Sequence, residues 1–157
     1  MIERYLVVAS RICQELADLE RVVTRAEKAM SLARYSTEHD FYLDSVALNM
    51  HDFYSGLERI FRHIATDVDQ SLPVGSEWHR DLLLQMSVSI MQLRPHVISK
   101  DTVKGLDEYL RFRHIVRNVY AFTFDAERID RLIRQLRPLF NQLHSELIVF
   151  VSFLKQV

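Results

Sequence analysis

Residues 43–64 read LDSVALNMHDFYSGLERIFRHI, and this stretch decides the fold. Its apolar side chains recur in alternating steps of three and four over three heptads, which places them along one face of an α-helix. These positions are Leu43, Val46, Met50, Phe53, Leu57, Ile60 and Ile64. Such a stripe in a chain of 157 residues is typical of the core of a helical bundle. Gly56 lies within it, and we expect it to allow the close approach of a neighbouring helix.

Further helices are predicted on both sides of this stretch. The expected ranges are about 3–33, 77–92 and 101–121, followed by a last helix with apolar residues from 129 to 154. The range 77–92 ends before Arg94-Pro95, because the residue before a proline is pushed out of the helical region. We expect Ser99 or Asp101 to cap the next helix, and Pro138 to kink or split the last one.

Glycine and proline are scarce, with three of each in 157 residues, which disfavours a sandwich or barrel with frequent turns. The sequence therefore predicts an all-α fold, a four- to five-helix up-and-down bundle that forms a single domain over residues 1–157. The one cysteine, Cys13, excludes an internal disulfide and is interpreted as a small core residue. Arg11 interrupts the first apolar run, so we expect a cytoplasmic protein with no membrane partner.

The most unusual stretch is RFRHIVRNVY, residues 111–120, which combines three arginines with a histidine, an asparagine and a tyrosine. At about 100° per residue, the predicted core face of this helix carries Tyr109, Phe112, Val116 and Val119. A second face carries Leu106, Leu110, Arg113, Arg117 and Tyr120. This mixture is typical of a surface that meets another chain or an anionic ligand, and a symmetric homodimer would bring two arginine sets together.

These arginines also have a simpler interpretation, in which they are solvated or paired with acidic residues of a neighbouring helix. The whole chain is nearly neutral, with 20 Lys and Arg against 21 Asp and Glu. Residues 94–137, however, contain ten Lys and Arg against six Asp and Glu. This local excess favours a phosphate-bearing partner, because arginine is a planar two-pronged donor.

Other chemistry is poorly supported. The chain contains no P-loop and no G-x-G-x-x-G, G-x-S-x-G or H-E-x-x-H pattern, which excludes the nucleotide-fold enzymes. His51 and His63 have no suitably spaced partners, and His79 is interpreted as a packing residue beside Trp78. We therefore expect no metal and no cofactor.

Residues 106–120, LDEYLRFRHIVRNVY, with Phe122 and the FVSFL segment at 150–154, resemble the HepT-like branch of the HEPN superfamily. Residues 40–49 and Trp78-His79 fit the same branch. The resemblance implies a HEPN-like helical bundle that forms a homodimer. It also implies a metal-independent ribonuclease with a composite site at the dimer interface, since many HEPN proteins carry an Arg and a His separated by four to six residues.

In HepT toxins a Tyr follows that His by two residues. Here Arg113 begins the motif, Tyr120 ends it and Asn118 stands at the position of the His. Asparagine can hydrogen-bond RNA but cannot carry a proton near neutral pH. Three outcomes follow: His114, one turn earlier, replaces the base; the protein binds RNA or nucleotide without cutting; or the sequence carries a substitution that removes toxicity.

The resemblance further implies the roles of individual residues. A ribose 2′-hydroxyl would attack the adjacent phosphate while Arg113 stabilises the developing charge, and Arg111, Arg113, Arg117 and Tyr120 would bind the RNA. The implied partner is a nucleotidyltransferase antitoxin that attaches AMP to Tyr120 and so blocks the RNA groove. The alternatives are a non-catalytic module that binds a nucleotide or the nucleotidyltransferase, and a purely structural bundle.

Overall fold

The computed structural model describes residues 2–157, apart from the side chains of Ile2 and Phe122. Within that range the chain forms five α-helices and a short 3₁₀-helix, so the predicted all-α helical bundle is confirmed. The helices are α1 (Ile2–Tyr35), α2 (His39–Asp67), α3 (Trp78–Met86), α4 (Lys100–Asn118), η1 (Ala121–Thr123) and α5 (Ala126–Gln156).

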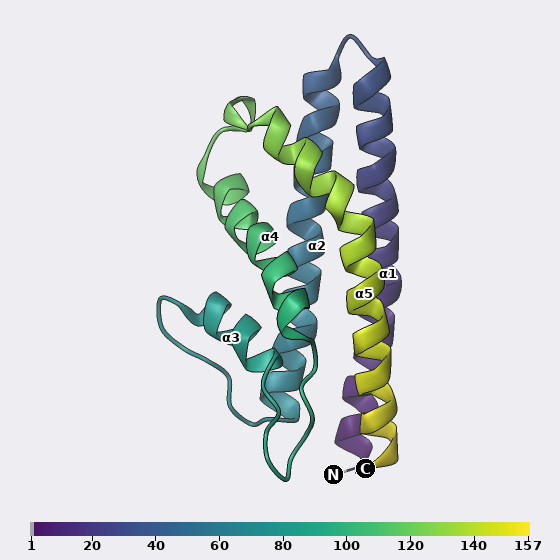
Figure 1. Ribbon diagram of the computed structural model, residues 1–157, viewed down its shortest axis with the longest axis vertical. Coiled ribbons are helices and arrows are strands. Elements are labelled where there is room, and N and C mark those ends of the chain that lie inside the picture. The colour runs from purple at the N-terminus through teal and green to yellow at the C-terminus, as the bar shows by residue number, and fades with distance from the viewer. Residues whose placement is uncertain (1) are drawn as a thin grey trace.

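Helix α1 makes the most extensive contacts of the bundle, with α2 and with α5 (Figure 1). Helix α4 lies against α2, and the short α3 packs at the lower ends of α2 and α4 (Figure 1). The predicted stripe of α2 is buried from Val46 to Ile64, and Leu43 is half-buried. A Cβ on Gly56 would lie 2.7 Å from Cδ2 of Leu19, which confirms the close approach of α1.

Helix α5 is continuous from Ala126 to Gln156, so the predicted split at Pro138 does not occur. The helix does change direction, running obliquely over its first turns and then alongside α1 (Figure 1). Leu136 and Phe140 are buried on either side of the proline. The apolar stripe therefore remains packed through the position where one backbone hydrogen bond is lost.

Helix α3 ends at Met86, earlier than the predicted range 77–92. The Met86 carbonyl accepts hydrogen bonds from the backbone N–H groups of Val97 and Ile98, so the chain folds back on the helix end instead of extending it. The N-cap of α4 is Ser99, whose Oγ accepts from the Thr102 N–H at 3.2 Å. Of the two predicted caps, Ser99 and Asp101, the first is therefore confirmed.

Candidate functional site

A groove of about 630 Å³ lies between the first residues of α3 and the second half of α4. We call it the α3–α4 groove. Its lining comprises Ser76, Glu77, His79, Arg80, Leu110, Arg111, Arg113, His114, Ile115, Arg117, Asn118 and Arg128. Five arginines and two histidines therefore face one open space, whereas the described lining contributes a single carboxylate. Such a surface suits a phosphate-bearing ligand.

Most of the residues predicted from residues 111–120 meet in this groove. Arg111, Arg113, His114, Arg117 and Asn118 all line it. The turns of α4 bring them to one wall, because residues three and four apart share a helix face.

Tyr120 does not line the α3–α4 groove, so its predicted place on one helical face with Arg113 and Arg117 is wrong. The prediction assumed a helix to residue 121, but α4 ends at Asn118 and Val119 is extended, with φ −131° and ψ 161°. The Asn118 side chain bonds back to the last turn, and asparagine and β-branched valine both disfavour further helix. Tyr120 is 76% exposed beyond the helix end. Val119, predicted to lie in the core, is exposed as well.

Arg113 is held by α2. Its Nε donates to Oγ of Ser55 at 3.1 Å, and the side chain is partly buried. Tyr54 lies buried nearby, and burial, reinforced by the Glu58 carboxylate, raises the pKa of its phenol far above the ordinary value. The phenol therefore remains neutral at physiological pH. The Ser55 hydroxyl that holds Arg113 is also neutral, so it does not compensate the positive charge of the guanidinium.

The five arginines of the α3–α4 groove differ in their partners. Arg80 and Arg111 share the carboxylate of Asp107, at 2.7 and 3.2 Å. Within residues 2–157, no ion pair with a carboxylate is shown for the other three, which are Arg113, Arg117 and Arg128. The simpler interpretation, in which helical arginines pair with neighbouring acids, thus accounts for only part of this cluster. The remaining positive charge is available to an anion.

Comparison with protein-family models gives a match to HepT-like protein over residues 45–154. The chain belongs to the HepT-like protein family. The resemblance predicted from residues 106–120 is therefore confirmed, and the matched range includes every residue of the α3–α4 groove. No curated protein and no solved structure matches the chain. None of the described helices combines the length and apolarity needed to span a bilayer.

In this HepT-like protein the asparagine at the motif position contacts the histidine one turn earlier. Nδ2 of Asn118 donates to the His114 carbonyl at 2.7 Å and lies 3.3 Å from Nδ1 of the His114 ring. The first contact identifies the amide atom as nitrogen, so the second contact makes Nδ1 an acceptor. The proton of the neutral His114 ring therefore resides on Nε2, and this histidine meets a ligand as a hydrogen-bond donor.

The sequence reasoning missed a second histidine of the groove. Nδ1 of His79 lies 2.7 Å from Oε2 of Glu58, whose side chain is only 7% exposed. The His79 ring also stacks on the Trp78 ring, with 3.6 Å between the ring centres. The guanidinium carbon of Arg62 lies over the Trp78 ring, 5.0 Å from the ring centre. The Trp-His pair at the start of α3 was the available signal, but its acidic partner lies in α2 and only the fold reveals it. Arg80 and Arg128 were also missed.

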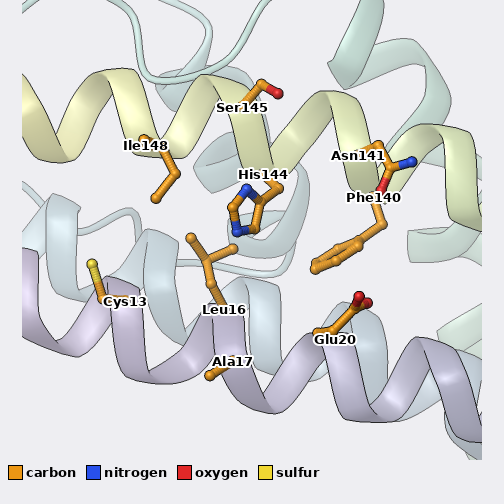
Figure 2. Close-up of a pocket in the computed structure, with 9 residues that line it drawn as sticks. All are labelled: Cys13, Leu16, Ala17, Glu20, Phe140, Asn141, His144, Ser145 and Ile148. Carbon is orange, nitrogen blue, oxygen red and sulfur yellow. The ribbon is translucent and has the colours of Figure 1, made fainter.

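A second cavity, of about 540 Å³, is lined by residues of α1 and α5 where the two helices pack together. Figure 2 shows side chains of both helices facing one another across it, with Cys13, Leu16 and Glu20 opposite His144 and Ile148. Cys13 is exposed here, so its predicted place in the core is wrong; position 13 follows the buried Ile12 and faces outward. The described lining includes no arginine or lysine. This cavity of the HepT-like protein is therefore unsuited to phosphate.

Proposed function

We propose that this HepT-like protein is the toxin of a toxin–antitoxin pair and acts as a metal-independent endoribonuclease, with RNA bound in the α3–α4 groove. The observation that carries the proposal is the meeting of Arg113, Arg117 and Arg128, none with a carboxylate partner among the described residues, beside two histidines. Uncompensated guanidinium groups bind the phosphates of RNA, and imidazoles transfer protons near neutral pH.

The proposed reaction is a transesterification. The ribose 2′-oxygen attacks the adjacent phosphorus, the bond from phosphorus to the 5′-oxygen breaks, and the products end in a 2′,3′-cyclic phosphate and a 5′-hydroxyl. Arg113 stabilises the negative charge that develops on the phosphoryl oxygens. Arg111 and Arg117 hold the flanking phosphates, while His114 donates a hydrogen bond from Nε2 and Asn118 positions the His114 ring through Nδ1. We further propose that two copies of the chain form a homodimer and complete the site together.

RNA incubated with the purified protein in EDTA is expected to be cut, with cyclic phosphate and 5′-hydroxyl ends identified by mass spectrometry. DNA of the same sequence should remain intact, because it lacks the attacking 2′-hydroxyl. Arg113→Ala serves as the control for contaminating nucleases. Identical RNA decay with both proteins, or none with either, would contradict a ribonuclease.

The second candidate function is non-catalytic binding of a nucleotide or of a nucleotidyltransferase. Asn118 favours it, because an amide replaces the imidazole at the motif position and is itself engaged by His114. Saturable binding of a ribonucleotide without cleavage of RNA would establish this function in place of the first.

We also propose that a nucleotidyltransferase antitoxin neutralises the protein by attaching AMP to Tyr120. The side chain is exposed on an extended segment just past α4, where another enzyme can reach it. With ATP and the antitoxin, the mass should increase by one adenylate group and RNA cleavage should cease. Tyr120→Phe should abolish this mass increase, whereas Tyr35→Phe, at another exposed tyrosine, should not. Equal modification of both variants would contradict Tyr120 as the acceptor.

A further inference from the structure

The two histidines of the α3–α4 groove are held in opposite tautomers. The Glu58 carboxylate accepts a hydrogen bond from Nδ1 of His79 at 2.7 Å, so the proton of the neutral ring lies on Nδ1 and Nε2 carries a lone pair. His114 has the reverse arrangement, because Asn118 donates to its Nδ1. A proton acceptor must present a lone pair to its substrate. The hydrogen bonds on the two rings therefore separate their roles.

The surroundings of His79 restrict its ring to one orientation. Glu58 is buried in α2, and Trp78 stacks against the imidazole with 28° between the ring planes. The His79 side chain is 30% exposed and lines the groove with Arg113 and Arg117. A carboxylate on Nδ1 orients an imidazole and stabilises the imidazolium that forms when the other nitrogen accepts a proton. Glu58 can fill this positioning role.

We infer that His79 is the general base of the α3–α4 groove and that it performs the proton transfer for which Asn118 is chemically unsuited. This inference rests on the proposed ribonuclease function. Nε2 of His79 takes the proton of the 2′-hydroxyl as the 2′-oxygen bonds to phosphorus. The departing 5′-oxygen takes a proton from water, and the hydroxide so formed removes the proton from His79. His114 donates a hydrogen bond from Nε2 to a phosphoryl oxygen and transfers no proton.

The test compares two histidine variants in EDTA. His79→Asn keeps an amide donor for Glu58 but lacks the Nε2 lone pair, and it should reduce kcat for RNA cleavage by about 10²-fold or more with little change in KM. His144→Asn, in the cavity between α1 and α5, is the matched control and should cleave normally. Added imidazole should restore part of the activity of His79→Ala, which a structural defect would not allow. Glu58→Gln should lower kcat while preserving RNA binding.

A second readout is independent of cleavage. The ring nitrogen signals of His79 are followed by NMR as cytidine 3′-monophosphate is added, with His144 as the internal reference. If the wild type cleaves RNA and His79→Asn cleaves equally well, the base assignment is overturned and the ribonuclease stands. If the wild type does not cleave, the ribonuclease and the base are both overturned, and a shift of the His79 signals alone supports its contact with the nucleotide. Unchanged signals overturn that contact too.

Discussion

Replacement of Arg113 by alanine is expected to lower kcat for RNA cleavage by about 10²–10³-fold, the usual consequence of removing one preorganised donor from a developing oxyanion. The guanidinium lies in the wall of the α3–α4 groove, tethered through Nε to Ser55. Its two terminal nitrogens are thereby left for the phosphate. Because the tether is a neutral hydroxyl, the full positive charge acts on the reacting group.

Arg113→Lys should recover only a small part of this loss. Lysine keeps the charge but lacks the planar fork, and it cannot bond Ser55 while presenting two donors to a phosphate. Arg134→Ala is the matched control, because it also removes one positive charge, from an exposed arginine of α5 that pairs with Asp130. The three variants are compared by initial cleavage rates in EDTA and by thermal unfolding. Equal losses for Arg113→Ala and Arg134→Ala would indicate only a general charge effect and would contradict the assigned role.

Replacement of Arg94 by methionine is expected to lower the free energy of unfolding by about 3–5 kcal/mol, the usual cost of removing one partner of a buried ion pair. The Arg94 and Asp69 side chains are 0% and 1% exposed, and the terminal Nη2 of Arg94 meets Oδ2 of Asp69 at 2.7 Å. The guanidinium also donates to the carbonyls of Val88, Gln85 and Pro95. Methionine fills the space but removes every hydrogen bond of the guanidinium, and the buried Asp69 carboxylate keeps only the side-chain hydrogen bond from Nε2 of Gln85.

Urea unfolding measures this loss directly. Arg131→Met removes an exposed pair with Glu108 and should change the free energy of unfolding by less than about 1 kcal/mol. In the Arg94→Met background, Asp69→Asn should recover part of the stability, because it removes the stranded buried charge. A loss below about 1 kcal/mol for Arg94→Met would show that the pair is solvated in solution. Arg94 joins Asp69, just past the end of α2, to the end of α3. Removal of the guanidinium should therefore also loosen α3, the helix that presents His79.

The fold was predictable where one helix face carried a continuous apolar stripe. Residues 43–64 fixed the position of α2 because packing of that stripe outweighs local propensity. The end of α3 was mispredicted because it depends on the Met86 carbonyl, which accepts from the distant N–H groups of Val97 and Ile98. Pro138 did not split α5, since the buried residues on both sides of it hold the two parts together.

The candidate site was predictable only along a single helix. Arg113 and Arg117 share a face of α4 by simple periodicity, but Tyr120 lay beyond an unforeseen helix end. The pairing of His79 with Glu58 spans 21 positions and joins two helices, so no local spacing could indicate it. Motif spacing thus identified one wall of the groove, and the opposite wall came from tertiary packing.

Asp107 has a consequence for the thermodynamics of ligand capture. By pairing with both Arg80 and Arg111, this carboxylate immobilises two long side chains before any ligand arrives. Binding of an anion to Arg80 and Arg111 therefore costs little further side-chain conformational entropy. Binding to the exposed Arg117 costs more, because the anion itself must order that side chain. The rim has one stiff side and one adaptable side, which suits a polymer whose successive units differ in shape but repeat the same charge.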